Sequence, residues 1–192
     1  AYPADNAAVL GSLLLHQRAS GINHAAATAP LLARFRLAWR HPRSGLLFPQ
    51  VDLTDGQPAG VARAGVTAMA ALWLAHGERE LARDLYLSVR DRCADTVIGF
   101  GFINEFHIGL AELATKAAAD ETLLAGVSPA ATVAALGSAR RFGERHVFID
   151  LYRTIHLAGL PSGGSSGRRF LTAGPEGNAL LLAALTSTSD QP

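Results

Sequence analysis

The stretch AALWLAHGERELARDLY, residues 70–86, decides the fold because its pattern returns in AALGSARRFGERHVFIDLY, residues 134–152. Each copy reads as an almost uncharged helix, a Gly-Glu-Arg turn, a charged helix and a Leu-Tyr pair. The Gly-Glu-Arg triplets start at Gly77 and Gly143, and 143 − 77 = 66 residues also separate the two Leu-Tyr pairs. Repeated helical hairpins are typical of helical arrays and α/α toroids. We expect the uncharged helix of each pair to face inward and the charged helix to face water.

Seven or eight helices are expected along the whole chain. Helical periodicity, with glycine and proline at the boundaries, places them at about 5–17, 30–39, 64–76, 78–94, 110–124, 128–142, 144–158 and 178–187. Ser128-Pro129 is the strongest start signal, because serine caps free amides and proline suits a first turn. Pro30 is expected in a first turn for the same reason.

Three segments do not fit a helix period. Leu46–Leu53 reads as extended and residues 54–57 as a turn, which predicts a small β-hairpin. Residues 98–109 are rich in glycine and aromatic residues and read as a loop or strand. Residues 161–167 contain SGGSSG, which is typical of a flexible linker within the domain.

The predicted fold class is all-α, with helical hairpins of an α/α toroid and one small β-hairpin. A closed toroid of six hairpins needs about twelve helices, so the chain should form about half of an (α/α)6 barrel. Its 192 residues suffice for a single domain, 1–192, with a sizeable core. Because Tyr2–Asp5 leads directly into a helix without an initiator methionine, we expect a C-terminal part of something longer.

Composition and charge exclude several kinds of partner and cofactor. Seventeen basic and sixteen acidic residues give a net charge of +1, so the chain has no excess of positive charge with which to bind nucleic acid or an anionic membrane. No apolar run reaches the roughly 20 residues that a membrane span requires. The single Cys93 excludes an intrachain disulfide and is compatible with the cytoplasm. Without clustered cysteines, paired histidines or a phosphate-binding glycine motif, neither a metal nor a nucleotide cofactor is expected.

Asp5, Glu105 and His107 are the candidate catalytic residues. Asp5 opens an apolar helix, where it either caps the helix or faces a site as a base or cation stabiliser. Glu105 and His107 lie in FINEFHIG, where strand alternation would place both on one face and Phe106 on the other. Carboxylate and imidazole suffice for proton transfer near neutral pH, although an ordinary polar loop edge is the alternative.

Aromatic and charged residues near these positions are candidates for substrate binding. Charge among Phe102 and Phe106 is costly unless it is paired or used. Arg63 could bind a substrate oxygen or a carboxylate, or could clamp a loop. Glu176 and Asn178 precede the last apolar helix, and Asn178 is suited to cap it.

Five stretches in order resemble the catalytic α/α toroid of bacterial linalool dehydratase/isomerase-like proteins. They are residues 2–17 (YPADNAAVLGSLLLHQ), 31–65, 126–143 (GVSPAATVAALGSARRFG), 156–161 and 167–183 (GRRFLTAGPEGNALLLA). The resemblance implies the C-terminal half of that domain. It also implies acid and base groups at the starts of inner helices, acting on a tertiary alcohol.

An aromatic-x-x-Cys-Asn stretch of that family matches Tyr2-Pro3-Ala4-Asp5-Asn6. The resemblance therefore places Asp5 at the catalytic cysteine position and adds Tyr2 and Asn6 to the substrate-binding residues. Cys93 lies on an outer-type helix and cannot replace that thiol, so the family's thiol chemistry is not expected here.

The expected function is that of a cofactor-independent lyase or isomerase acting on a small alcohol or terpenoid-like substrate. Two alternatives stay open. Similar toroids host glycoside hydrolases and polysaccharide lyases, in which paired carboxylates act, and a helical scaffold without activity needs its polar residues only as caps. Besides the small molecule, the expected partner is a second copy, or a partner chain or N-terminal half that completes the toroid.

Overall fold

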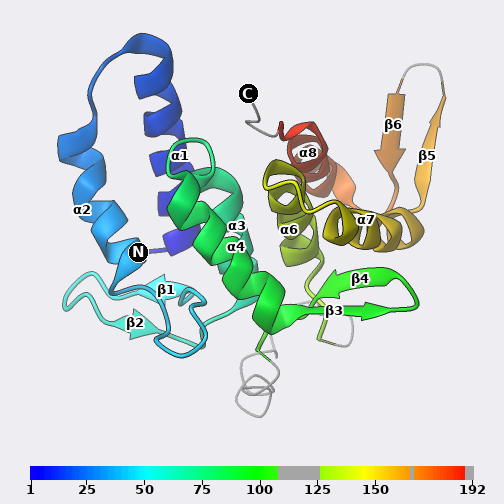
Figure 1. The fold of residues 1–192 in the computed structure, drawn as a ribbon, viewed down its shortest axis with the longest axis horizontal. Coiled ribbons are helices and arrows are strands. Elements are labelled where there is room, and N and C mark those ends of the chain that lie inside the picture. Colours follow the sequence, from blue (N-terminus) through cyan, green and yellow to red (C-terminus); the bar gives the residue numbers. More distant parts are fainter. Residues whose placement is uncertain (108–125, 165–166, 189–192) are drawn as a thin grey trace.

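The computed structural model describes residues 1–107, 126–164 and 167–188. In these ranges Figure 1 shows a mostly helical chain with three short β-hairpins. The helices are α1 (Pro3–Ser20), α2 (Ala25–Arg36), α3 (Ala64–Leu74), α4 (Arg79–Cys93), α6 (Pro129–Arg141), α7 (Arg145–Gly159) and α8 (Gly174–Thr186). The strands are β1 (Gln50–Val51), β2 (Pro58–Ala59), β3 (Ala94–Val97), β4 (Phe100–Ile103), β5 (Pro161–Gly164) and β6 (Gly167–Phe170).

The prediction of an all-α toroid is wrong. Seven helices and three antiparallel hairpins, β1–β2, β3–β4 and β5–β6, make the described chain mixed α/β, and its helices show no closed toroid. Only the β1–β2 hairpin was expected. The β3–β4 turn has positive φ at Ile98 (51°) and Gly99 (77°), the backbone of a primed hairpin turn. An isoleucine rarely adopts that conformation, so its sequence gives little sign of the turn.

Some of the helix and loop boundaries expected from the sequence differ in the structure, and others are confirmed. Pro30 lies inside α2, which begins at Ala25, and not in a first turn. The N-cap at Ser128 is confirmed, because its hydroxyl accepts the Ala131 amide of α6. The expected helix over 110–124 lies outside the described residues. The described ends of the expected linker, 161–167, belong to strands β5 and β6.

The described helices form two layers. Helices α1, α3, α6 and α8 pack side by side as an inner row, each against the next. Helices α2, α4 and α7 pack on the outside of α1, α3 and α6. The expected repeat is confirmed, since the outer helices α4 and α7 begin at Arg79 and Arg145, and 145 − 79 = 66 residues.

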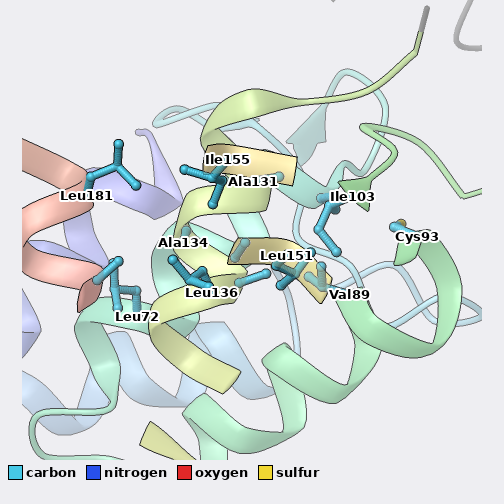
Figure 2. Packing of buried hydrophobic residues seen from close by; sticks show 14 of the residues in the cluster. Leu72, Val89, Cys93, Ile103, Ala131, Ala134, Leu136, Leu151, Ile155 and Leu181 are labelled. Carbon is cyan, nitrogen blue, oxygen red and sulfur yellow. The ribbon is translucent and has the colours of Figure 1, made fainter. Parts of the chain in front are cut away.

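Small residues allow the inner helices to approach closely. The core between α3, α6 and α7 is built from alanine and leucine, and Leu136 and Leu151 lie together within it (Figure 2). A Cβ on Gly137 would lie 2.7 Å from Leu72 and 3.0 Å from the backbone of Ala184. Close-packed interiors tolerate no such addition without movement, so glycine sets the spacing of this row.

The start of every inner helix carries the same side-chain bond. An asparagine or threonine in the first turn or two donates to the carbonyl four residues earlier, following the pattern Pro/Ala-x-x-Asn/Thr. The pairs are Asn6 to Tyr2 (2.8 Å), Thr67 to Arg63 (2.7 Å), Thr132 to Ser128 (2.8 Å) and Asn178 to Gly174 (2.6 Å).

In α3, α6 and α8 the same polar side chain also accepts a backbone N–H from the extended segment before the helix. Leu47 donates to Thr67 (2.8 Å), Ile103 to Thr132 (3.1 Å) and Phe170 to Asn178 (2.8 Å). We call this pair of bonds a helix-start bridge. The three donors are buried apolar residues, exposed by 0%, 1% and 5%. Each bridge therefore anchors one extended segment to one inner helix.

We expect Gly11→Ala to lower the free energy of unfolding by about 1–3 kcal/mol, the usual cost of overpacking. A Cβ at Gly11 would lie 2.5 Å from the Trp73 carbonyl oxygen, so α1 and α3 would have to separate. Urea unfolding followed by circular dichroism measures the change. Ser12→Ala on the exposed face of the same helix is the control and should change stability by no more than about 0.5 kcal/mol. Equal effects of the two substitutions would contradict the close α1–α3 contact.

Candidate functional site

A cleft of about 670 Å³ opens where α1, α3 and α6 begin. Tyr2 and Asp5 line it from α1, Arg63 and Met69 from α3, and Glu105 from the segment after β4. Because first-turn residues of neighbouring helices share this cleft, their N-terminal amide ends point toward it. The structure thus brings together four of the residues expected from the sequence.

Asp5 does not cap α1. The helix begins at Pro3 with Tyr2 as its N-cap residue, so Asp5 lies in the first turn, and no side chain caps the helix. Its carboxylate is exposed and makes no hydrogen bond or ion pair with any residue that the structure describes. Of the two expectations for Asp5, capping is therefore wrong, and the side chain lines the cleft.

Glu105 is held tightly at the start of α3. The residue is only 2% exposed. Its carbonyl oxygen accepts the Ala64 amide (2.7 Å), and its Oε1 accepts the Gly65 amide (3.3 Å). A Cβ on residue 65 would lie 2.9 Å from the carboxylate, which is why glycine is needed there.

Arg63 supplies the positive charge beside Glu105. Its Nε lies 4.0 Å from Glu105 Oε1, and its side chain is 16% exposed. The guanidinium also lies 5.8 Å from the centre of the Phe106 ring, a cation–π contact. Arg63 is thus both a clamp on Glu105 and a cation lining the cleft.

The expected strand alternation around Glu105 does not continue. Strand β4 ends at Ile103, and the chain bends at Glu105 and Phe106, which are both buried. His107 is half-buried and is not among the described residues that line the cleft. At this bend the Glu105 carboxylate accepts the Gly65 amide. Phe102 pairs with Asp95 across the β3–β4 hairpin and also lies away from this cleft.

Asn6 and Asn178 serve the helix starts. Asn178 does not cap α8. It lies inside the helix and bonds to both the amide and the carbonyl of Phe170 (2.8 and 2.9 Å). Asn6 bonds to the Tyr2 carbonyl. The two residues share a structural position. Each donates to the carbonyl four residues earlier, which is that of Tyr2 for Asn6 and that of Gly174 for Asn178.

Glu176 lines a second cleft, of about 720 Å³, between α3, α6 and α8. This cleft is mainly apolar, with Trp73 and Leu180 in its wall. Met69 and Ala130 line both clefts, so the two adjoin along the inner row. Sequence reasoning missed Met69 and Trp73, although both recur at helical spacing on one face of α3.

Cys93 takes no part in the cleft. The thiol is fully buried at the end of α4, and burial together with the nearby Glu105 carboxylate raises its pKa to about 12. A protonated, enclosed thiol is a poor nucleophile. Thiol chemistry is therefore excluded for this residue.

Within the described ranges, no group of three or more His, Cys, Asp or Glu side chains could hold a metal ion. His16 and His24 approach at the α1–α2 turn, with Nδ1 and Nε2 2.9 Å apart, but they are bonded to each other.

No model of a known protein family matches the chain, and no curated protein matches it either. None of the helices in the described ranges is long and apolar enough to cross a membrane.

The buried thiol predicts a loss of stability in alkali. The thiol of an unfolded chain ionises near pH 9.0, whereas Cys93 in the native chain stays protonated up to a pKa of about 12. Between these values the unfolded state loses a proton that the native state keeps. The free energy of unfolding of the protein should therefore fall by about 1.4 kcal/mol for each unit by which the pH rises in this range.

Urea unfolding at a series of pH values measures this dependence, and Cys93→Ala should flatten the slope by about one proton. Tyr86, whose pKa is also raised by burial and by Glu144, adds a further alkaline loss in both proteins above about pH 10, so the comparison is made between pH 9 and pH 10. An unchanged slope in Cys93→Ala would contradict the assignment to the thiol.

Proposed function

We propose that the chain is a cofactor-independent lyase or isomerase that acts on a small alcohol or terpenoid-like substrate in the cleft at the start of α1, α3 and α6. The observation that carries this proposal is the pairing of an exposed carboxylate, Asp5, with a buried and neutralised one, Glu105, in the same cleft. One carboxylate is free to exchange a proton, while the other fixes the position of Arg63.

Elimination of water from an alcohol needs a base for a carbon-bound proton and a cation for the departing oxygen. Asp5 would take the proton from the carbon next to the C–O bond, and Arg63 would stabilise the oxygen as that bond breaks. The leaving hydroxide then takes the proton from Asp5. Alkene and water are the products, and the carboxylate is regenerated.

The adjoining apolar cleft suits the hydrocarbon part of such a substrate. Met69 connects the two clefts, and Trp73 and Leu180 provide apolar surface further along the inner row. The resemblance to linalool dehydratase/isomerase-like proteins supports the same substrate class, with Asp5 in place of the family's cysteine. His107, away from the cleft lining, has no part in this proposal.

A carbohydrate is the second candidate substrate. Tyr2 is 56% exposed at the cleft, where an aromatic ring can stack on a sugar, and two carboxylates are present. Glycoside hydrolysis would use Asp5 with Glu105 as its acid and base. The burial of Glu105 against the Gly65 amide favours the alcohol over the sugar, because a paired carboxylate is not free to move a proton.

We also propose that a second copy of the chain, or a partner chain, binds beside α1.

We expect Asp5→Asn to abolish proton exchange without unfolding the chain. The purified protein is incubated in D2O with a panel of allylic and tertiary alcohols and, separately, with aryl glycosides. The alkene formed and the deuterium that the reverse reaction returns to the recovered alcohol are measured by mass spectrometry. Asp5→Asn should lower incorporation at least about 100-fold, the usual contribution of a general base, while its melting temperature stays close to that of the wild type because the carboxylate has no partner among the described residues.

Glu80→Gln is the matched control. Glu80 is also an exposed carboxylate in a first turn, but it belongs to the outer helix α4 and lines no cleft described above. It should leave incorporation unchanged. Release of aryl alcohol without deuterium exchange would favour the carbohydrate. Equal incorporation in Asp5→Asn and wild type would contradict the proposal.

A further inference from the structure

A third cleft, of about 470 Å³, lies where the four inner helices end, and we call it the end cleft. Arg18 lines it from the last turn of α1, and Trp73 lines it from the last turn of α3. Arg141, the last residue of α6, and Thr186, the last residue of α8, complete this part of its wall. The end cleft therefore lies at the opposite ends of the helices from the cleft that contains Asp5.

The polar side chains of the end cleft are mainly hydrogen-bond donors. Arg18, His76 and Arg141 lie in its wall, and the hydroxyls of Ser187 and Thr188 lie beside them. No aspartate or glutamate is among the described residues that line it. Two guanidinium groups with no carboxylate in the same wall favour a negatively charged ligand.

Arg141 is a buried cation in the wall of the end cleft. The residue is only 6% exposed. Burial of a guanidinium costs free energy unless negative charge or acceptor groups lie around it. The guanidinium has five N–H donors, so Arg141 can bind a ligand oxygen in addition to the contacts that it already makes.

Arg18 supplies a second guanidinium, which is held in position. Its Nη1 donates to the His76 carbonyl oxygen (2.8 Å), and this bond fixes the group against the end of α3. Its Nη2 forms no hydrogen bond with any residue that the structure describes. The planar arrangement of its N–H groups matches the oxygens of a carboxylate or a phosphate.

An apolar surface continues from the end cleft into the second cleft. Trp73 and Ala183 line both, so the two clefts adjoin. The Trp73 indole stacks on the His76 ring, with centroids 6.5 Å apart and planes at 26°. Beyond Trp73 the wall includes Val133 and Leu180. A ligand that fills both clefts therefore needs a charged group at one end and hydrocarbon at the other.

We propose that the end cleft binds an amphiphilic anion, a hydrocarbon that carries a carboxylate or a phosphate group. The anionic group lies among Arg18, His76 and Arg141, and the hydrocarbon lies against Trp73 and extends into the second cleft. This site does not rest on the proposed function, because it uses neither Asp5 nor Arg63.

Tryptophan fluorescence of the whole chain tests the site directly. The chain has two tryptophans, and Trp39 is only 1% exposed in the core, so a change on binding reports on Trp73. Octanoate and octyl phosphate are titrated below their critical micelle concentrations, with neutral octanol as the comparison. At least one anion should bind at least about tenfold more tightly than octanol, because hydrogen bonds to charged groups are the stronger ones.

The chain length of the ligand tests the apolar part of the site. Butanoate should bind more weakly than octanoate, by about fourfold for each CH2 group that is no longer buried. The tighter of octanoate and octyl phosphate identifies the anionic group that the site prefers.

Arg18→Gln and Arg83→Gln are the matched variants. Glutamine at position 18 can still donate to the His76 carbonyl but carries no charge, so Arg18→Gln should weaken the binding of the anion about tenfold and leave octanol unchanged. Arg83 is an exposed arginine of the outer helix α4 and lines none of the clefts described above, so Arg83→Gln should change neither. Because Arg18 is exposed, its substitution does not depend on the tolerance of a buried position.

Three results would overturn the proposal: no saturable change in fluorescence, equal affinities for octanol and the anions, or equal effects of Arg18→Gln and Arg83→Gln. The deuterium assay on the same protein separates this site from the proposed enzyme. Binding of the anion without any proton exchange would leave the end cleft standing and refute the enzyme.

Discussion

One hydroxyl or amide group at the start of each inner helix, buried in α3 and α6 and half-buried in α1 and α8, fixes the geometry of the site. Thr67, which is fully buried, donates to the Arg63 carbonyl and accepts the Leu47 amide, so its hydroxyl is used in both directions. A buried polar group with both roles satisfied rigidifies the segments that it joins. The same bridge recurs in α6 and α8. The first turns of neighbouring inner helices therefore lie side by side, and the cleft is formed between them.

The opposite ends of the hairpins are joined by a second repeated contact. Glu78 and Glu144 occupy the Gly-Glu-Arg turns, and each binds an arginine of the preceding outer helix, Arg36 and Arg90. The Arg36 pair is largely exposed, and such pairs contribute little to stability. The Tyr86 hydroxyl also donates to Glu144 (3.1 Å), which makes the second contact a partly buried network. These contacts join successive hairpins at the Gly-Glu-Arg turns, whereas the helix-start bridges act at the helix starts.

The sequence predicted the helical repeat because the Gly-Glu-Arg turns are local signals with a fixed spacing. It failed on the fold class, because the β3–β4 turn depends on Ile98 in a conformation that isoleucine disfavours, and local propensity does not indicate such a turn. The cleft was predicted in part. Charge is conspicuous beside apolar segments and so indicates Asp5, Arg63 and Glu105, but the position expected for His107 was wrong because strand alternation does not continue past the bend.

The helix-start bridges are also visible in the sequence once their chemistry is known. Asn6 and Asn178 stand out as polar residues at helix starts and suggest substrate binding, whereas Thr67 and Thr132 are inconspicuous within their helices. All four fit Pro/Ala-x-x-Asn/Thr, and the pattern emerges only when asparagine and threonine are treated as equivalent hydrogen-bonding groups. Bridge residues satisfy backbone groups, so their polarity does not indicate substrate contact.

The two carboxylates of the cleft differ in burial and in their neighbours. Glu105 is buried beside the half-buried Arg63 and the Gly65 amide, and loss of its negative charge would remove the ion pair with Arg63. A change in its charge would therefore disturb the start of α3. Asp5 is exposed and makes no hydrogen bond or ion pair with any residue that the structure describes, so its carboxylate holds no other segment in place. The proton transfer that we propose for this cleft therefore uses Asp5, with Glu105 holding Arg63 in place.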